Sequence, residues 1–164
     1  MGNGHPLAAV VTRPEIAETL ANEMSYFNTF GGNPVSCAAG LAVLEVIEKE
    51  ALQQNALEVG QYLRERLEIV QGDYPVIGEL HGSGLLQGID IIKPDGALNP
   101  EMADHIMNHM RENGVLIGTT GQNYATLKIR PPIVFQKEHA EILLVALIKA
   151  LDELLSLQAA SAQA

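Results

Sequence analysis

The sequence predicts an α/β (α+β) fold in which helices cover a small, largely antiparallel sheet. Apolar residues recur at helical spacing through residues 34–70, and short β-rich runs return within residues 76–92 and 115–130. The predicted order is helix, helix, hairpin, helix, strand, strand, helix. No internal repeat or long linker interrupts this series.

Residues 7–11, near the start of the chain, form a short apolar run with β-branched valines between Pro6 and Pro14. Such a run predicts a buried strand. A buried strand needs neighbours, and no other strand is predicted within about the next sixty residues. We therefore expect its partners to belong to a larger domain.

The two helices that follow differ in pattern. Residues 34–48 are apolar almost all round, with small residues around Gly40, so we expect this helix to be buried on several sides. From Leu52 to Val70, apolar residues recur at helical spacing, and charged residues are offset from them. This pattern predicts a helix with one buried face.

A β-hairpin is predicted next, because residues 76–80 and 85–92 are β-rich and Gly82-Ser83-Gly84 lies between them. The glycine spacing continues to Gly88 and superficially resembles a dinucleotide-binding motif. A strand rather than a helix follows, so we expect no nucleotide there.

The remaining predicted elements are a helix at 99–113, strands at 115–117 and 126–130, a helix at 138–155, and a fraying end at 158–164.

Composition argues against several classes of partner. The 10 basic and 20 acidic residues give a net charge of −10, which repels nucleic acid and anionic lipid. No apolar run reaches membrane-spanning length.

Cys37 is the only cysteine, which favours a reducing, cytoplasmic setting. His105 and His109 lie one helical turn apart, but no third ligand accompanies them, so we expect no metal.

The segment Tyr26-Phe27-Asn28-Thr29-Phe30-Gly31-Gly32-Asn33-Pro34 has the features of an anion site. The two glycines let the backbone approach a ligand, and Thr29 adds a hydroxyl donor. Asn33 and Pro34 favour a helix start, whose N–H groups would point back at the loop. These residues alone also fit a tight connection into a well-capped helix. Spacing does not decide between the two interpretations.

Three segments in order carry a family resemblance: Gly2-Asn3-Gly4-His5-Pro6-Leu7, then Thr29 to Pro34, then Leu127-Lys128-Ile129-Arg130-Pro131-Pro132. Together they resemble the class III aminotransferases, most closely the alanine-glyoxylate aminotransferase and amino-phosphate phospholyase branch. The resemblance extends to about residue 155. It implies the C-terminal small domain of a fold-type I enzyme at residues 33–164. Residues 1–32 would then be a remnant of the large domain, with a strand, a helix and the phosphate loop.

The resemblance also implies a cofactor, pyridoxal 5'-phosphate, and a homodimer. Thr29 with Asn28 would bind the cofactor phosphate that belongs to the other subunit. In that family the lysine that forms the Schiff base lies just before the segment that starts here at Gly2. We therefore expect that lysine upstream of Met1, no catalytic residue within this chain, and no activity from the chain alone.

Lys128 and Arg130 alternate with apolar residues in a predicted strand, so both should point to one face. One interpretation is an edge strand protected by charge. The resemblance gives another, because many class III aminotransferases have an arginine at the position of Lys128 that holds the substrate carboxylate. A lysine cannot form the planar fork. A phosphorylated amine would tolerate this change better, and Arg130 could partly compensate.

The function implied by the resemblance is amino-group transfer between an amino acid or amine and a 2-oxo acid. Two alternatives stay open: a phospholyase that acts on a phosphorylated amine, and a non-catalytic dimerisation or binding domain. His81 stands where the family usually has arginine, so an ion pair that relatives form there need not exist in this chain.

Overall fold

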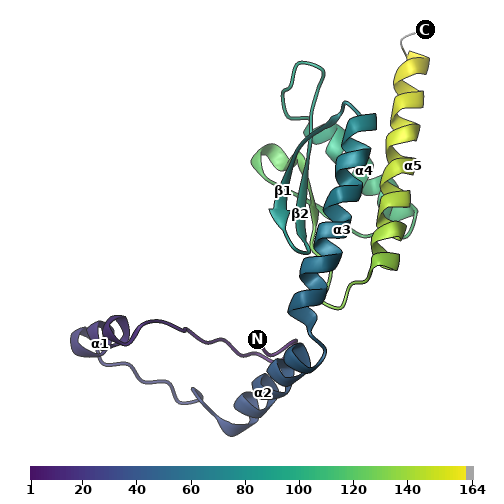
Figure 1. Ribbon diagram of the computed structural model, residues 1–164. Helices are drawn as coiled ribbons and strands as arrows, with labels where there is room; N and C mark the ends of the chain where they lie inside the picture. Colours follow the sequence, from purple (N-terminus) through teal and green to yellow (C-terminus); the bar gives the residue numbers. More distant parts are fainter. Residues whose placement is uncertain (162–164) are drawn as a thin grey trace. The chain divides into compact units, whose positions relative to one another are not determined.

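The computed structural model describes residues 1–161 (Figure 1). The chain divides into two compact units, Met1–Leu52 and Gln53–Ala164. The domain boundary near Asn33 that the family resemblance implies stays a prediction.

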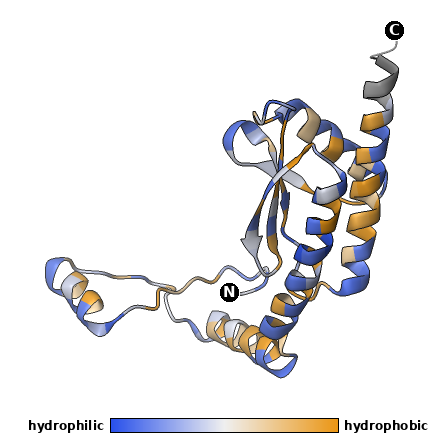
Figure 2. Ribbon diagram, turned by 45° about the horizontal axis from the view of Figure 1, so that its top comes forward, coloured by the Kyte–Doolittle hydropathy of each residue, from blue (hydrophilic) through white to orange (hydrophobic). Residues whose placement is uncertain are grey.

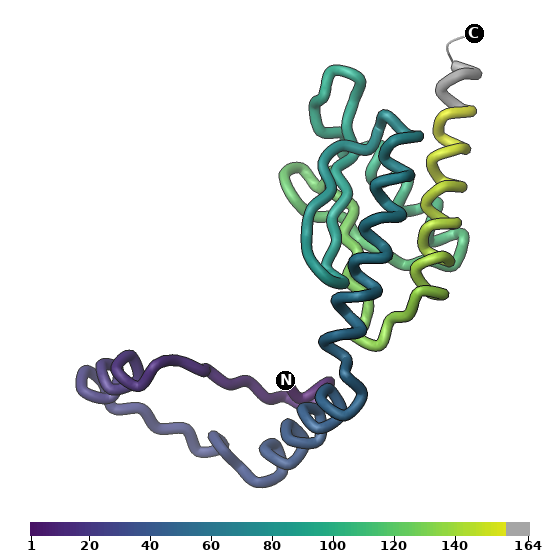
Figure 3. Tube along the Cα trace, in the orientation of Figure 1, coloured from purple at the N-terminus to yellow at the C-terminus, as the bar shows by residue number. Residues whose placement is uncertain are grey.

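The first unit contains helices α1 (Pro14–Glu23) and α2 (Pro34–Lys49). The trace in Figure 3 shows extended chain before α1 and again between the two helices. Asn33 caps α2 and Pro34 is its first residue, as predicted. Gly40 of α2 lies against Leu7, since an added Cβ would lie 2.5 Å from the Leu7 Cδ2 atom.

The buried strand predicted at residues 7–11 is wrong for this chain. These residues belong to no strand, and the side chains of Val10 and Val11 are 90% and 96% exposed. The physical reason is that a strand needs a hydrogen-bonded neighbour, and none of the described residues of this unit provides one. β-branched composition alone does not form a strand.

Helix α2 lies where the sequence predicts it, but it is not buried on several sides as predicted. Gly40 is its only buried residue, whereas Val35, Leu41 and Leu44 are exposed. Figure 2 shows apolar residues along most of its length. Most apolar side chains of α2 are therefore not packed against any of the residues that the structure describes.

The second unit is built on a four-stranded antiparallel sheet, which confirms the predicted fold class. Its strands are β1 (Ile77–Ser83), β2 (Leu86–Ile91), β3 (Gly118–Thr120) and β4 (Thr126–Ile129). Their spatial order is β1-β2-β4-β3, so β4 lies between β2 and β3. The predicted hairpin is present as β1 and β2, with Ser83 opposite Leu86.

Helices α3 (Leu52–Asp73), α4 (Pro100–Glu112) and α5 (Lys137–Ser161) pack with this sheet around one core (Figure 1). A short 3-10 helix, η1 (Gln122–Tyr124), precedes β4. The core joins one face of each helix to one face of the sheet. Its fully buried large side chains are Leu63, Leu67, Ile89, Ile91, Ile106, Met110, Leu127, Ile129, Leu144, Leu147 and Leu151.

Element ends follow local chemistry. The Asn99 side chain caps α4 by accepting from the Met102 N–H at 3.2 Å, and Gly114 follows the helix with a φ of +81°. Strand β3 begins at Gly118, three residues later than the start predicted at 115. Helix α5 continues through Ser161, so the fraying predicted from residue 158 is wrong as far as 161. Residues 162–164 lie outside the described residues.

None of the described helices combines the length and the apolar composition needed to cross a membrane.

Candidate functional site

Asn28 organises the loop that the sequence singles out. Its Oδ1 accepts hydrogen bonds from the backbone N–H of Phe30 at 3.2 Å and of Gly31 at 3.0 Å. Its Nδ2 donates to the Tyr26 hydroxyl at 3.2 Å. Side-chain oxygens of asparagine commonly close turns in this way. Asn28 therefore shapes the loop around Thr29.

Asn33 holds the loop to the helix entrance. Its Oδ1 accepts from the Ser36 N–H at 2.9 Å, and its Nδ2 donates to the Phe30 carbonyl at 2.8 Å and to the Ser36 hydroxyl oxygen at 3.0 Å. The same hydroxyl oxygen lies 2.9 Å from His5 Nε2. The first turn of α2 is thus fixed from two sides by side chains. Sequence reasoning found the Asn33 cap but missed His5, which no local spacing connects to Ser36.

The loop keeps donors that fit an anion. The Thr29 residue is exposed, and no hydrogen bond joins its hydroxyl to another residue of the described chain. An asparagine amide has two N–H donors, and Asn28 uses one of them on Tyr26. Gly32 has a φ of +68° and open space where a Cβ would be. A hydroxyl, an amide N–H and a helix N-terminus fit the phosphate of pyridoxal phosphate. The roles of Thr29 and Asn28 toward that group stay predictions.

Lys128 lies in the middle of the sheet, which excludes the edge-strand interpretation. Strand β4 is hydrogen-bonded to β2 on one side and to β3 on the other, and Lys128 lies opposite Gly88 and Gly118. Both of these cross-strand neighbours lack a side chain. A charged residue at this place is not protecting an exposed edge.

Lys128 and Arg130 line one pocket together with Ile129. Leu127 and Ile129 are buried in the core, at 0% and 2% exposure. The pocket has a volume of about 600 Å³ and is bounded by the chain before β3, the end of β4 and the start of α5. His139 joins the two cations in its lining, and most other lining residues are apolar. The pocket combines positive charge with apolar walls, which suits a small anion with a carbon skeleton.

His81, Asp90 and Thr126 form a hydrogen-bonded group on the same face of the sheet as Lys128. His81 Nε2 lies 2.9 Å from Asp90 Oδ2, and the Thr126 hydroxyl donates to Asp90 Oδ1 at 2.5 Å. The hydrogen bond to Asp90 raises the pKa of His81 above its ordinary value. His81 therefore contacts a carboxylate in this chain, and the contact is an ion pair when the imidazole is protonated.

The fold is one that transaminases of fold type I share. The family model "Aminotransferase class-III" matches residues 1–151. The chain therefore belongs to the class III aminotransferase family, whose members depend on pyridoxal phosphate.

Relatives of two activities resemble this chain. An alanine–glyoxylate aminotransferase 2 homologue from Arabidopsis thaliana is 49% identical over 90% of this chain and 31% of its own length. An ethanolamine-phosphate phospho-lyase homologue from Caenorhabditis elegans is 37% identical over 96% of this chain and 33% of its own length. The solved phospholyase from Arthrobacter, in complex with phosphoethanolamine, is 45% identical with a TM-score of 0.88. That match covers 93% of this chain and 36% of the phospholyase chain. This chain thus spans about a third of the length of these relatives.

Proposed function

We propose that this chain is part of a pyridoxal-phosphate-dependent aminotransferase that transfers an amino group between an amino acid or amine and a 2-oxo acid. The family match over residues 1–151 supports this proposal most directly. The bound cofactor supplies an electron sink for the carbanion at the substrate carbon. The residues of this chain contribute binding and orientation.

Thr29 and Asn28 anchor the cofactor phosphate in this proposal. The hydroxyl and the amide N–H donate to phosphate oxygens, and the capped entrance of α2 adds a favourable dipole. The family resemblance assigns this contact to the cofactor of the partner subunit, so we propose a homodimer. We also propose a cytoplasmic setting, which a single cysteine favours.

Lys128 and Arg130 bind the anionic group of the substrate in this proposal. Gly118, opposite Lys128, leaves space beside the lysine, since an added Cβ there would meet only the Lys128 Cε atom, at 4.0 Å. An ammonium meets a phosphate well as a point charge but cannot make the bidentate contact of an arginine with a carboxylate.

The second candidate function is therefore a phospholyase that acts on a phosphorylated amine. One specific observation favours it, namely the 45% identity to a phospholyase solved with phosphoethanolamine. A non-catalytic dimerisation or binding domain is a third alternative. It is the weakest of the three, because the relatives that this chain matches are longer proteins named as enzymes.

The first experiment tests the phosphate anchor. In the full-length protein, Thr29→Ala should raise the dissociation constant for pyridoxal phosphate about tenfold, because it removes a hydrogen bond to a charged group. Thr19→Ala is the matched control, since the Thr19 hydroxyl donates to the Glu15 carbonyl within α1. An unchanged dissociation constant in Thr29→Ala would contradict the anchoring role.

The second experiment separates the two activities. The full-length protein is assayed for amino transfer from α-amino acids and for phosphate release from phosphoethanolamine. Lys128→Ala should raise KM for the true substrate, whereas Lys149→Ala on α5 should not. Brisk transfer from α-amino acids without phosphate release would rule out the phospholyase. Phosphate release without transfer would rule out the aminotransferase.

A further inference from the structure

The loop between β4 and α5 forms one wall of the pocket that Arg130 lines. Four loop residues after Arg130 also line the pocket, namely Pro131, Pro132, Val134 and Phe135. The two prolines carry no N–H, so the loop has few backbone hydrogen bonds of its own. One of them joins the Phe135 N–H to the Pro132 carbonyl at 2.9 Å. The position of the loop therefore depends on contacts with other parts of the chain.

Asn55 of α3 holds this loop from a distant part of the sequence. Its Nδ2 donates to the Ile133 carbonyl at 3.0 Å and to the Phe135 carbonyl at 3.0 Å. An asparagine amide has two N–H donors, so both are used on this one loop. Among the described residues outside the loop and α5, only Asn55 forms a hydrogen bond with residues 131–136. Asn55 does not line the pocket, so it acts on the pocket through the loop.

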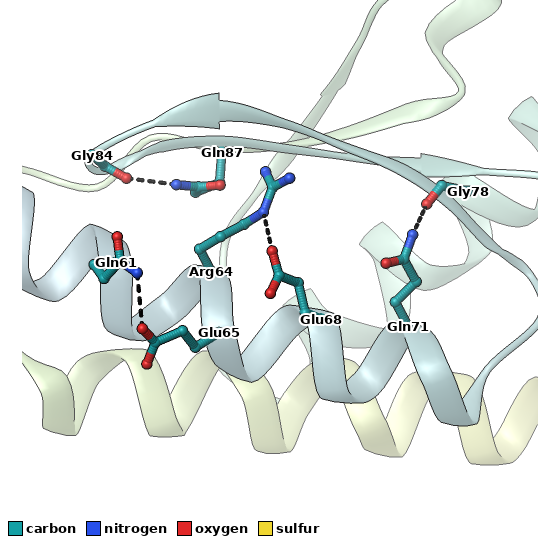
Figure 4. A network of polar contacts seen from close by, with 8 residues as sticks. All are labelled: Gln61, Arg64, Glu65, Glu68, Gln71, Gly78, Gly84 and Gln87. Carbon is teal, nitrogen blue, oxygen red and sulfur yellow. Dashed lines mark hydrogen bonds and ion pairs between the residues drawn. The ribbon is translucent and has the colours of Figure 1, made fainter.

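Other polar side chains of α3 make two kinds of contact. Figure 4 shows Arg64 donating to Glu68, and this contact joins side chains one turn apart on the same helix. Such a contact supports only the helix that makes it. Gln71 instead reaches the sheet, where it donates to the Gly78 carbonyl. Asn55 makes a contact of this second kind, but with the wall of the pocket.

We propose that Asn55 is a positioning residue for substrate binding, because it fixes the loop that follows Arg130. This inference rests on the proposed function, in which Lys128 and Arg130 bind the anionic group of the substrate. Arg130 is followed by a proline, and a residue in that place has a restricted backbone. A shift of the loop is therefore passed on to Arg130 rather than absorbed before it. Asn55 thus sets where the cation meets the substrate.

Asn55→Asp in the full-length holoenzyme separates this role from a role in α3. Aspartate has the same shape, but its oxygens would face the two loop carbonyls without a donor. Asn55 lies in the first turn of α3, where an acidic residue favours the helix. We expect KM for the substrate that the enzyme converts, phosphoethanolamine or an α-amino acid, to rise about tenfold. The value of kcat should stay within about twofold, since binding rather than chemistry is weakened.

Two further variants sharpen the test. Gln53→Glu is the matched control, because it adds the same charge to the same turn at an exposed residue, and it should leave KM unchanged. Asn55→Ala removes both donors without adding charge and should raise KM in the same direction as Asn55→Asp. It carries the test if Asn55→Asp does not fold.

Hydrogen exchange of the full-length protein, followed by mass spectrometry, gives a readout besides activity. Amides of residues 133–136 should exchange about fivefold faster or more in both Asn55 variants, because the loop loses its hydrogen bonds to α3. The amides of α3 should exchange as they do in Gln53→Glu. Unchanged exchange of the loop would overturn the inference. Faster exchange throughout α3 with an equal fall in kcat would also overturn it, since Asn55 would then act in folding.

Lys128→Ala distinguishes failure of this inference from failure of the proposed function. If Lys128→Ala raises KM and both Asn55 variants keep the KM of the unmodified enzyme, only the role of Asn55 is overturned. An unchanged KM in Lys128→Ala would overturn the substrate role of the pocket, and the inference about Asn55 with it.

Discussion

Gly60 of α3 lies directly against the backbone of Gly84 in the β1–β2 turn. A Cβ added at Gly60 would lie 2.3 Å from the carbonyl carbon and oxygen of Gly84. Real Cβ atoms do not come so close, and the obstructing atoms are backbone that cannot rotate away. The absence of a side chain at Gly60 thus sets how closely the helix approaches the hairpin.

Gly60→Ala should lower the free energy of unfolding by at least about 1 kcal/mol, because overpacking outweighs the gain of about 1 kcal/mol in helix propensity. Gly72→Ala is the matched control within α3, since an added Cβ there meets nothing within 4 Å. That control should be neutral or stabilising by up to about 1 kcal/mol. Urea denaturation measures both. Equal stability of the two variants would contradict the prediction, because it would show that the β1–β2 turn moves to accommodate the added Cβ.

Leu63 and Leu57 give a second comparison on α3. Leu63 is 0% exposed and Leu57 is 57% exposed. Leu63→Ala should cost about 2–5 kcal/mol, because it removes buried contacts and leaves a cavity. Leu57→Ala should change stability by no more than about 0.5 kcal/mol. Thermal unfolding followed by circular dichroism compares them, and similar losses would contradict the assignment of one buried face to α3.

Helix positions were predictable because their signals are local. The cap at Asn33, the glycine at 114 and the apolar spacing of α3 each act within a few residues. Strand order was not predictable, because β4 inserts between β2 and β3 through contacts distant in sequence. That order alone decided between an edge strand and a central one for Lys128.

The candidate sites were predictable in part for the same reason. Thr29 and Asn28 lie on one loop, so their proximity follows from the sequence. The contact of His81 with Asp90 requires the register of the hairpin. The burial of Gln87 had one local signal, because this glutamine is in phase with the isoleucines of β2.

Asn33→Ala should destabilise α2 by about 0.5–2 kcal/mol, because the Ser36 N–H loses its side-chain acceptor. Native-state hydrogen exchange of the α2 amides measures this loss locally. Asn33→Asp keeps an acceptor at the cap and should exchange like the unmodified chain. Faster exchange in both variants would instead point to the Nδ2 contacts of Asn33 with Phe30 and Ser36.

The pH dependence of the His81–Asp90 pair gives a further test. The hydrogen bond to Asp90 raises the pKa of His81 in the folded chain. The folded state therefore holds the proton more tightly than the unfolded state does, and the pair stabilises the fold fully below the ordinary histidine pKa of about 6.5. That contribution is lost as the pH rises through the folded pKa. The effect on stability should be small, because the His81 side chain is 44% exposed.

Titration of the His81 ring protons by nuclear magnetic resonance measures the shift directly. Asp90→Asn removes the carboxylate that stabilises the imidazolium, so it should lower the pKa of His81 relative to the unmodified chain. Thr126→Val removes only the hydroxyl that donates to Asp90 and leaves the carboxylate in place. The pKa of His81 should then stay above its ordinary value. An unchanged pKa in Asp90→Asn would assign the shift to Glu79, whose carboxylate lies 3.7 Å from His81 Nδ1.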